Sequence, residues 1–147
     1  MTIPRFRLLL IEDSQHRIDK ICSWLPEGCL LVVASSAGKA IGILQRDRGY
    51  IYGAVMLDHD LNEQALTEAD LSLSGSDLVE TLVTHLSRDA PILVHSMNAT
   101  RAPLVVQRLN RAGFEVTRLP FETLHRDTFL NWLEDARYNW ADAHGFQ

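Results

Sequence analysis

Residues 6–25 read FRLLLIEDSQHRIDKICSWL. The first part of this segment is a nearly unbroken apolar run that stops at Glu12 and Asp13, which is typical of a buried β-strand. Apolar residues then recur at the spacing of one helical face: Ile18, Ile21, Cys22 and Leu25. The segment therefore predicts a strand followed directly by a helix.

The same order recurs along the rest of the chain. Further strands are expected at residues 30–34, 53–57, 91–94 and 114–118. Helical periodicity follows each of them, beginning near residues 37, 75, 100 and 121. Strands that are apolar at nearly every position form a parallel sheet covered on both faces. We therefore expect a doubly wound α/β fold with a five-stranded parallel sheet, in a single domain that spans residues 1–147.

Composition and charge favour a globular domain and argue against a protein that binds duplex nucleic acid or spans a membrane. The chain has 147 residues, 46% of them hydrophobic and 22% charged, which suits one globular domain. Its net charge of −5 and the lack of a long basic run argue against duplex nucleic acid as a partner. The apolar runs fall far short of the roughly 20 residues that span a bilayer, and the N-terminus lacks a signal-peptide pattern. We expect a cytoplasmic protein without a membrane segment, in which Cys22 and Cys29 are buried free thiols.

Polar residues gather where the predicted strands end, which is where open parallel α/β sheets bind ligands. Four of them are carboxylates: Glu12, Asp13, Asp58 and Asp60. Such a cluster would repel itself unless a hard divalent cation shared its charge, and Mg²⁺ is the expected cofactor. A metal of this kind favours a phosphate ligand. The alternative is that the acids only cap the following helices, but Asp58 precedes a long segment with no adjacent helix to cap.

The order of these residues resembles the receiver domain of bacterial response regulators. The resemblance rests on Glu12-Asp13, Asp58, Ser96 and Pro120-Phe121. It implies a flavodoxin-like fold with strand order 2-1-3-4-5. It also implies roles for individual residues: Asp58 as phosphoryl acceptor, Glu12 and Asp13 as magnesium ligands, Asp60 as a backbone carbonyl ligand, and Ser96 as a hydroxyl that contacts phosphate.

The chain departs from the receiver pattern at three positions. It has Leu119 where receivers carry a Lys that clamps the phosphoryl oxygens, Val116 in place of an aromatic residue, and Met97 where a small residue is usual. An apolar Leu cannot neutralise charge that develops on a phosphate. Ordinary phosphorelay output is therefore not expected.

A narrower resemblance accounts for the histidines. Residues 57–61 (LDHDL), Gly75 with Asp77, and His95-Ser96 followed by Asn98 are similar to the receiver-like family named for predicted cyclic-phosphate processing. Opening a cyclic phosphodiester needs a base, an acid and cations. His59 and His95 are candidates for the acid and base. Ser96 and Asn98 could donate to phosphate oxygens, and Arg101, with Arg118 in reserve, could supply the charge that Leu119 does not.

Two questions stay open at this point. Side chains alternate along a strand, so if Ser96 reaches the cleft, His95 would pack under a helix, and the same objection applies to His59 beside Asp58. Residues 62–74 form either a lid or a surface insertion.

Three functions follow: a Mg²⁺-dependent phosphoryl site at Asp58, a cyclic phosphodiesterase that uses the histidines, or a pseudo-receiver that docks a protein partner through helix four, strand five and helix five.

Overall fold

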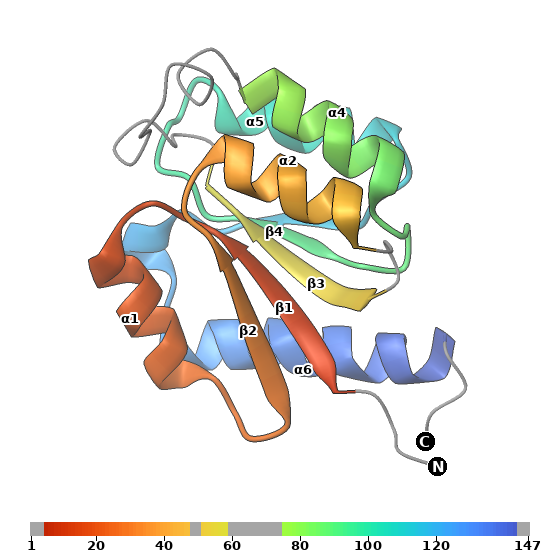
Figure 1. Cartoon of the computed structure of the whole chain (residues 1–147). Coiled ribbons are helices and arrows are strands. Elements are labelled where there is room, and N and C mark those ends of the chain that lie inside the picture. Colours follow the sequence, from red (N-terminus) through yellow and green to blue (C-terminus); the bar gives the residue numbers. More distant parts are fainter. Residues whose placement is uncertain (1–4, 48–50, 59–74, 144–147) are drawn as a thin grey trace.

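A five-stranded parallel sheet forms the centre of the protein (Figure 1). The structure is a computed structural model that describes residues 5–47, 51–58 and 75–143. Its strands are β1 (Phe6–Ile11), β2 (Cys29–Ala34), β3 (Tyr52–Leu57), β4 (Ile92–Val94) and β5 (Val116–Arg118). Their order in the sheet is β2-β1-β3-β4-β5, with every pair parallel. The predicted fold class and strand order are confirmed.

Helices cover both faces of the sheet. They are α1 (Gln15–Trp24), α2 (Ala37–Arg46), α4 (Gly75–His85), α5 (Ala102–Arg111) and α6 (Arg126–Ala143), with a short 3-10 helix, η2 (Phe121–Thr123). Figure 1 shows α1 and α6 on one face and α2, α4 and α5 on the other. Within the described residues, every helix is too short or too polar to cross a bilayer.

The predicted strands after the first shift by one or two residues at their starts, and two helices begin later than expected. The helix predicted from residue 121 begins at Arg126, because the chain first makes the 3-10 turn of η2 after Pro120. The helix predicted from about residue 100 begins at Ala102, with Pro103 in its first turn, where a missing N–H costs no helical hydrogen bond. Local turn chemistry, rather than apolar periodicity, sets both starting points.

The prediction of two buried thiols is wrong. Cys22 is exposed and Cys29 is half-buried, and both are free. On α1 the buried residues are Ile18 and Ile21, so the apolar stripe is narrow. Cys22 lies about 100° around the helix from Ile21, which takes its side chain out of the stripe and into solvent.

Two hydrophobic clusters lie on opposite faces of the sheet. On β1, Leu9 and Ile11 join the cluster under α2, α4 and α5, whereas Leu8 and Leu10 join the cluster with α1 and α6. The α1/α6 cluster also contains Met56 of β3, Leu93 of β4, and the side chains of Trp132 and Trp140 on α6. Successive residues of each strand thus alternate between the two faces.

The backbone ladder extends one residue beyond three of the strands. Ile11 pairs with Leu57, and Leu57 pairs with Val94. One step further, the N–H of Asp58 donates to Ile11 O (3.0 Å) and the N–H of His95 donates to Leu57 O (3.1 Å). The next residues of β1, β3 and β4 therefore form a row across the sheet, and alternation directs them to the face covered by α1 and α6.

Candidate functional site

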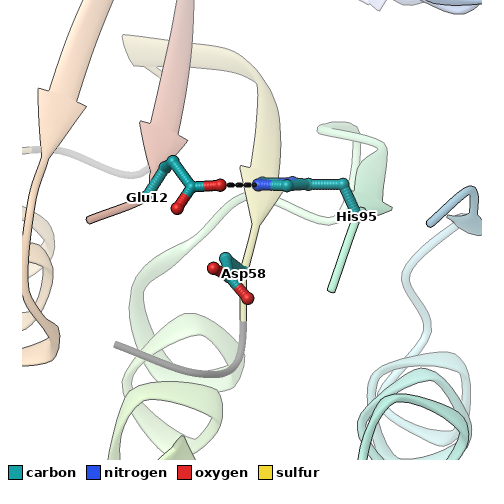
Figure 2. A group of neighbouring side chains, drawn as sticks. All are labelled: Glu12, Asp58 and His95. Carbon is teal, nitrogen blue, oxygen red and sulfur yellow. Dashed lines mark hydrogen bonds and ion pairs between the residues drawn. The ribbon is translucent and has the colours of Figure 1, made fainter. Parts of the chain in front are cut away.

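The row at the carboxyl ends of β1, β3 and β4 consists of Glu12, Asp58 and His95. These residues are 0%, 2% and 1% exposed. Each offers one potential ligand atom, and these atoms all lie within 4.8 Å of one another. Figure 2 shows the carboxylate of Glu12 and the imidazole of His95 pointing at each other, with Asp58 beside them. We call this group the strand-end cluster.

Backbone hydrogen bonds fix the position of the strand-end cluster. The N–H of Glu12 donates to Ala34 O (3.0 Å), which ties the end of β1 to β2. The carbonyl oxygen of His95 accepts from the N–H of Phe121 (2.9 Å), which ties the end of β4 to η2. The cluster is therefore attached to the sheet on both sides and does not depend on a free loop.

Glu12 is held as an anion. Its Oε1 lies 3.0 Å from His95 Nε2, and its Oε2 accepts from the N–H groups of Asp13 (2.9 Å) and Ser14 (3.1 Å). Burial by itself would raise the pKa of Glu12, but the hydrogen bond and charge of His95, together with the backbone N–H of Ser14, lower that pKa to about 2. Glu12 therefore carries a negative charge at neutral pH.

The cation that meets this charge is Arg17, a residue that sequence reasoning missed. Its Nη1 lies 3.5 Å from Glu12 Oε1 and 3.5 Å from Asp58 Oδ2. Its guanidinium also lies over the ring of Phe121, 5.3 Å from the centroid. The ring of Phe121 in turn packs edge-on against the imidazole of His95. Arg17 thus covers the cluster from the α1 side.

The position of Arg17 could have been anticipated from the sequence. Ser14 caps α1, and its Oγ accepts from the N–H of Arg17 (3.5 Å), so the helix begins immediately after the end of β1. Helical side chains lean toward the N-terminus of their helix. An Arg in the first turn of α1 therefore points back toward Glu12. The signal was the spacing of five residues between Glu12 and Arg17.

The cations proposed from sequence lie elsewhere. Arg101 is exposed and precedes the first residue of α5. Arg118 lines a groove beside α5, and its Nε is buried without a hydrogen-bond partner among the described residues. Leu119, at the position of the receiver Lys, packs against the α1/α6 cluster. Among the described residues, the arginine that contacts the carboxylates comes from α1.

Ser96 and Asn98 organise the turn that leads into α5. Ser96 is buried, and its Oγ accepts from the N–H of Asn98 (3.2 Å). Asn98 Oδ1 accepts from the N–H groups of Thr100 (3.1 Å) and Arg101 (2.9 Å). The question left open by alternation thus resolves in favour of His95, which shares its face with Glu12 and Asp58.

The remaining predicted site residues are not part of the strand-end cluster as described. Asp13 is buried beside it but is not one of its three members. His59 and Asp60 lie outside the described residues, as does the predicted lid at 62–74. The roles assigned to these residues stay predictions.

Comparison with known families agrees with this geometry. A sequence model described as "Cyclic-phosphate processing Receiver domain" matches residues 7–111, more than half of the chain. The chain belongs to this family of receiver domains. No curated protein matches it.

Solved receiver structures share the fold of this receiver. The receiver domain of a sensor histidine kinase from Pseudomonas aeruginosa, with a magnesium ion coordinated in its active-site cleft, matches with a TM-score of 0.64 and 20% identity over 89% of this chain and 96% of that one. A receiver domain of an HD domain-containing protein from Pseudomonas fluorescens matches with a TM-score of 0.70 and 12% identity, over 99% and 96%. The chemotaxis protein CheY4 of Vibrio cholerae matches with a TM-score of 0.64 and 16% identity, over 90% and 98%. At these identities the similarity establishes the fold.

Replacing the cation tests its part in stabilising the strand-end cluster. We expect Arg17→Gln to lower the free energy of unfolding of metal-free protein by about 1 to 3 kcal/mol, because it leaves two buried carboxylates with less compensation. Arg101→Gln is the matched control, and an exposed substitution of this kind changes stability by about 0.5 kcal/mol or less. Urea denaturation with EDTA present measures both. Equal effects of the two substitutions would contradict the assignment.

Proposed function

We propose that this receiver binds a divalent cation and a phosphoryl or cyclic-phosphate group at the strand-end cluster. One observation carries the proposal: Glu12, Asp58 and His95 are buried together at the carboxyl ends of adjacent parallel strands. Ligands of open α/β sheets bind at that edge. Carboxylate oxygens are ligands for hard divalent cations, and Mg²⁺ is the cofactor expected for the receiver fold. The family description points to a cyclic phosphate as substrate.

The residues of the cluster divide the chemistry between them. Glu12 and Asp58 would hold the cation, which offsets negative charge on the phosphate oxygens when bound. Arg17 lies beside both carboxylates and is only 23% exposed, so it is placed to contact an anion that binds next to them. It would supply the charge that Leu119 cannot.

Asp58 and His95 are the two candidates for direct participation. As a phosphoryl acceptor, Asp58 would attack phosphorus with a carboxylate oxygen while the leaving group departs with the bonding electron pair. In opening a cyclic phosphate, one histidine would take a proton from the water that attacks phosphorus, and the other would protonate the ester oxygen that leaves with the P–O bonding pair; His95, oriented by its hydrogen bond to Glu12, is placed for the second role. His59 is the second histidine of that hypothesis, with Ser96 and Asn98 as further phosphate contacts.

A phosphoryl mimic tests the site directly. We expect isothermal titration to show that the wild type binds beryllofluoride only when Mg²⁺ is present, because the cation and the acceptor oxygen act together. Asp58→Asn should abolish this binding, since it removes the anionic oxygen. Asp89→Asn, an exposed acid remote from the cluster, should leave it unchanged. Absence of binding by the wild type would refute phosphoryl acceptance.

Turnover of cyclic phosphates tests the enzymatic alternative. We expect hydrolysis of at least one member of a panel of 2′,3′- and 3′,5′-cyclic substrates, measured by chromatography of the products. His95→Gln should reduce turnover by roughly 10² to 10⁴-fold, the usual contribution of a general acid or base. His59→Ala tests the second histidine. The exposed His85→Gln serves as control, and turnover that survives both active-site substitutions would contradict the assigned roles.

A second candidate function is partner docking without phosphotransfer. It is favoured by a groove of about 540 Å³ beside α5 and β5, lined by Pro103, Val106, Gln107, Asn110, Arg111 and Arg118. Its mixture of apolar and cationic side chains suits a segment of a protein partner that carries apolar and acidic residues. This groove belongs to the surface proposed for docking through helix four, strand five and helix five of the receiver pattern, here α5, β5 and α6.

A pair of substitutions separates docking from phosphotransfer. If docking is the function, Arg111→Glu should weaken capture of a partner by roughly tenfold or more, because it places like charges in contact. Asp58→Asn should leave capture intact, because Asp58 lies at the strand-end cluster. A quantitative pull-down with purified variants measures both, and loss of capture by Asp58→Asn would contradict docking without phosphotransfer.

A further inference from the structure

We infer that the cation of the strand-end cluster is a divalent first-row transition-metal ion of the Mn²⁺, Fe²⁺ or Zn²⁺ type, and that His95 is one of its ligands. This inference rests on the proposed function, because it uses the same carboxylates; it changes the identity of the ion and makes His95 a metal ligand in place of the acid of the cyclic-phosphate hypothesis. The inference starts from His95, the third member of the cluster. It offers a nitrogen atom at a position where an all-oxygen site would have a carboxylate, a carbonyl or a water molecule.

The donor set separates the candidate ions. Mg²⁺ is bound through oxygen and retains several waters, whereas imidazole nitrogen suits zinc, iron and related ions. Glu12, Asp58 and His95 together offer two carboxylates and one imidazole. Mixed imidazole and carboxylate donors are typical of protein sites for transition metals, although the facial triad of non-haem iron and the His₂Glu sites of zinc have two imidazoles and one carboxylate, the reverse of the ratio here.

The spacing of the donor atoms is compatible with a shared ion. Ligand atoms that bind one ion at about 2.0 to 2.2 Å lie roughly 3 Å or slightly more from one another. His95 Nε2 and Glu12 Oε1 are 3.0 Å apart, and the potential ligand atom of Asp58 lies within 4.8 Å of both. A modest shift of the Asp58 side chain would complete the set.

The burial of His95 is a second observation that points to a ligand. The ring is directed into the cluster and is 99% buried, while its Nδ1 has no hydrogen-bond partner within the described part of the chain. Buried polar atoms of a purely structural residue are normally paired. An imidazole kept here with one nitrogen unpaired costs stability. The unpaired atom is Nδ1, whereas Nε2 faces Glu12 and is the nitrogen that a metal ion would take; ligation through Nε2 would give this buried ring a role beyond packing.

Arg17 leaves room for an incoming ion. Its contacts with both carboxylates are 3.5 Å long, at the limit of a hydrogen bond, and its side chain reaches solvent. The guanidinium would move away from Glu12 and Asp58 when a doubly charged ion replaces its charge. It would then be available to an anion bound on the metal, which joins this inference to the phosphate site.

Binding measurements on metal-free protein test the inference. Isothermal titration with Mn²⁺, Zn²⁺ and Mg²⁺ should give tighter binding for the transition metals. Most sites with nitrogen and oxygen ligands show that order, so the order by itself does not test the inference. The test is how far the affinity for each ion depends on His95. We expect His95→Gln to weaken Mn²⁺ and Zn²⁺ binding by roughly 10- to 100-fold, the range for loss of groups that support a metal site, and to change Mg²⁺ binding by less than about twofold. His85→Gln, on an exposed turn of α4, should change neither.

A spectroscopic measurement on the wild type covers the case in which His95→Gln does not fold. Pulsed electron paramagnetic resonance of the Mn²⁺-bound protein should show coupling to an imidazole nitrogen, and the coupling should persist in His85→Gln. Tight Mg²⁺ binding together with absence of this coupling would overturn the inference and leave the proposed function standing. Failure of the wild type to bind any of the three ions at millimolar concentration would overturn both.

Discussion

Two carboxylates buried at the end of a sheet require positive partners, and this requirement organises one whole edge of the protein. Glu12 and Asp58 are almost fully buried, where an uncompensated charge costs several kcal/mol. Their partners are His95 from β4 and Arg17 from α1. The contacts join the ends of three adjacent strands, which are far apart in sequence, to the first turn of α1, so the site and the packing of α1 against the strand ends form a single unit.

The geometry of the site follows from sheet register rather than from loop shape. Because β1, β3 and β4 are parallel and adjacent, their next residues fall in one row, and alternation gives that row a common face. Two residues before each member of the row lies an apolar side chain on the α1/α6 face: Leu10 before Glu12, Met56 before Asp58 and Leu93 before His95. The hydrophobic cluster under α1 and α6 thus continues, without a change of face, into the strand-end cluster.

The sequence predicted the sheet, its order and the acidic strand ends, because these depend on local patterns and on a resemblance spread along the chain. The sequence was less informative about the face of the sheet to which each residue at a strand end points. Judging His95 against its neighbour Ser96 left its face undecided; judging it against Leu93, two residues earlier, would have placed it beside Asp58. Arg17 was missed because it lies on a helix rather than at a strand end. The start of α6 was misplaced because the turn of η2 leaves no trace in apolar periodicity.

The move of the cation from β5 to α1 changes how a bound ligand can affect the rest of this receiver. In the receiver pattern a Lys after the fifth strand meets the phosphate, so the ligand acts on that strand directly. Here Leu119 is partly buried against the α1/α6 cluster, and the chain after β5 reaches the site through Phe121, whose ring lies under Arg17 and against His95. A ligand that displaced Arg17 would therefore act first on α1 and on the ring of Phe121. The N–H of Phe121 donates to His95 O, so movement of η2 would be transmitted to the end of β4 rather than along β5. The ring of Phe121, which contacts both the guanidinium of Arg17 and the imidazole of His95, is the contact through which the two sides of the strand-end cluster would be coupled.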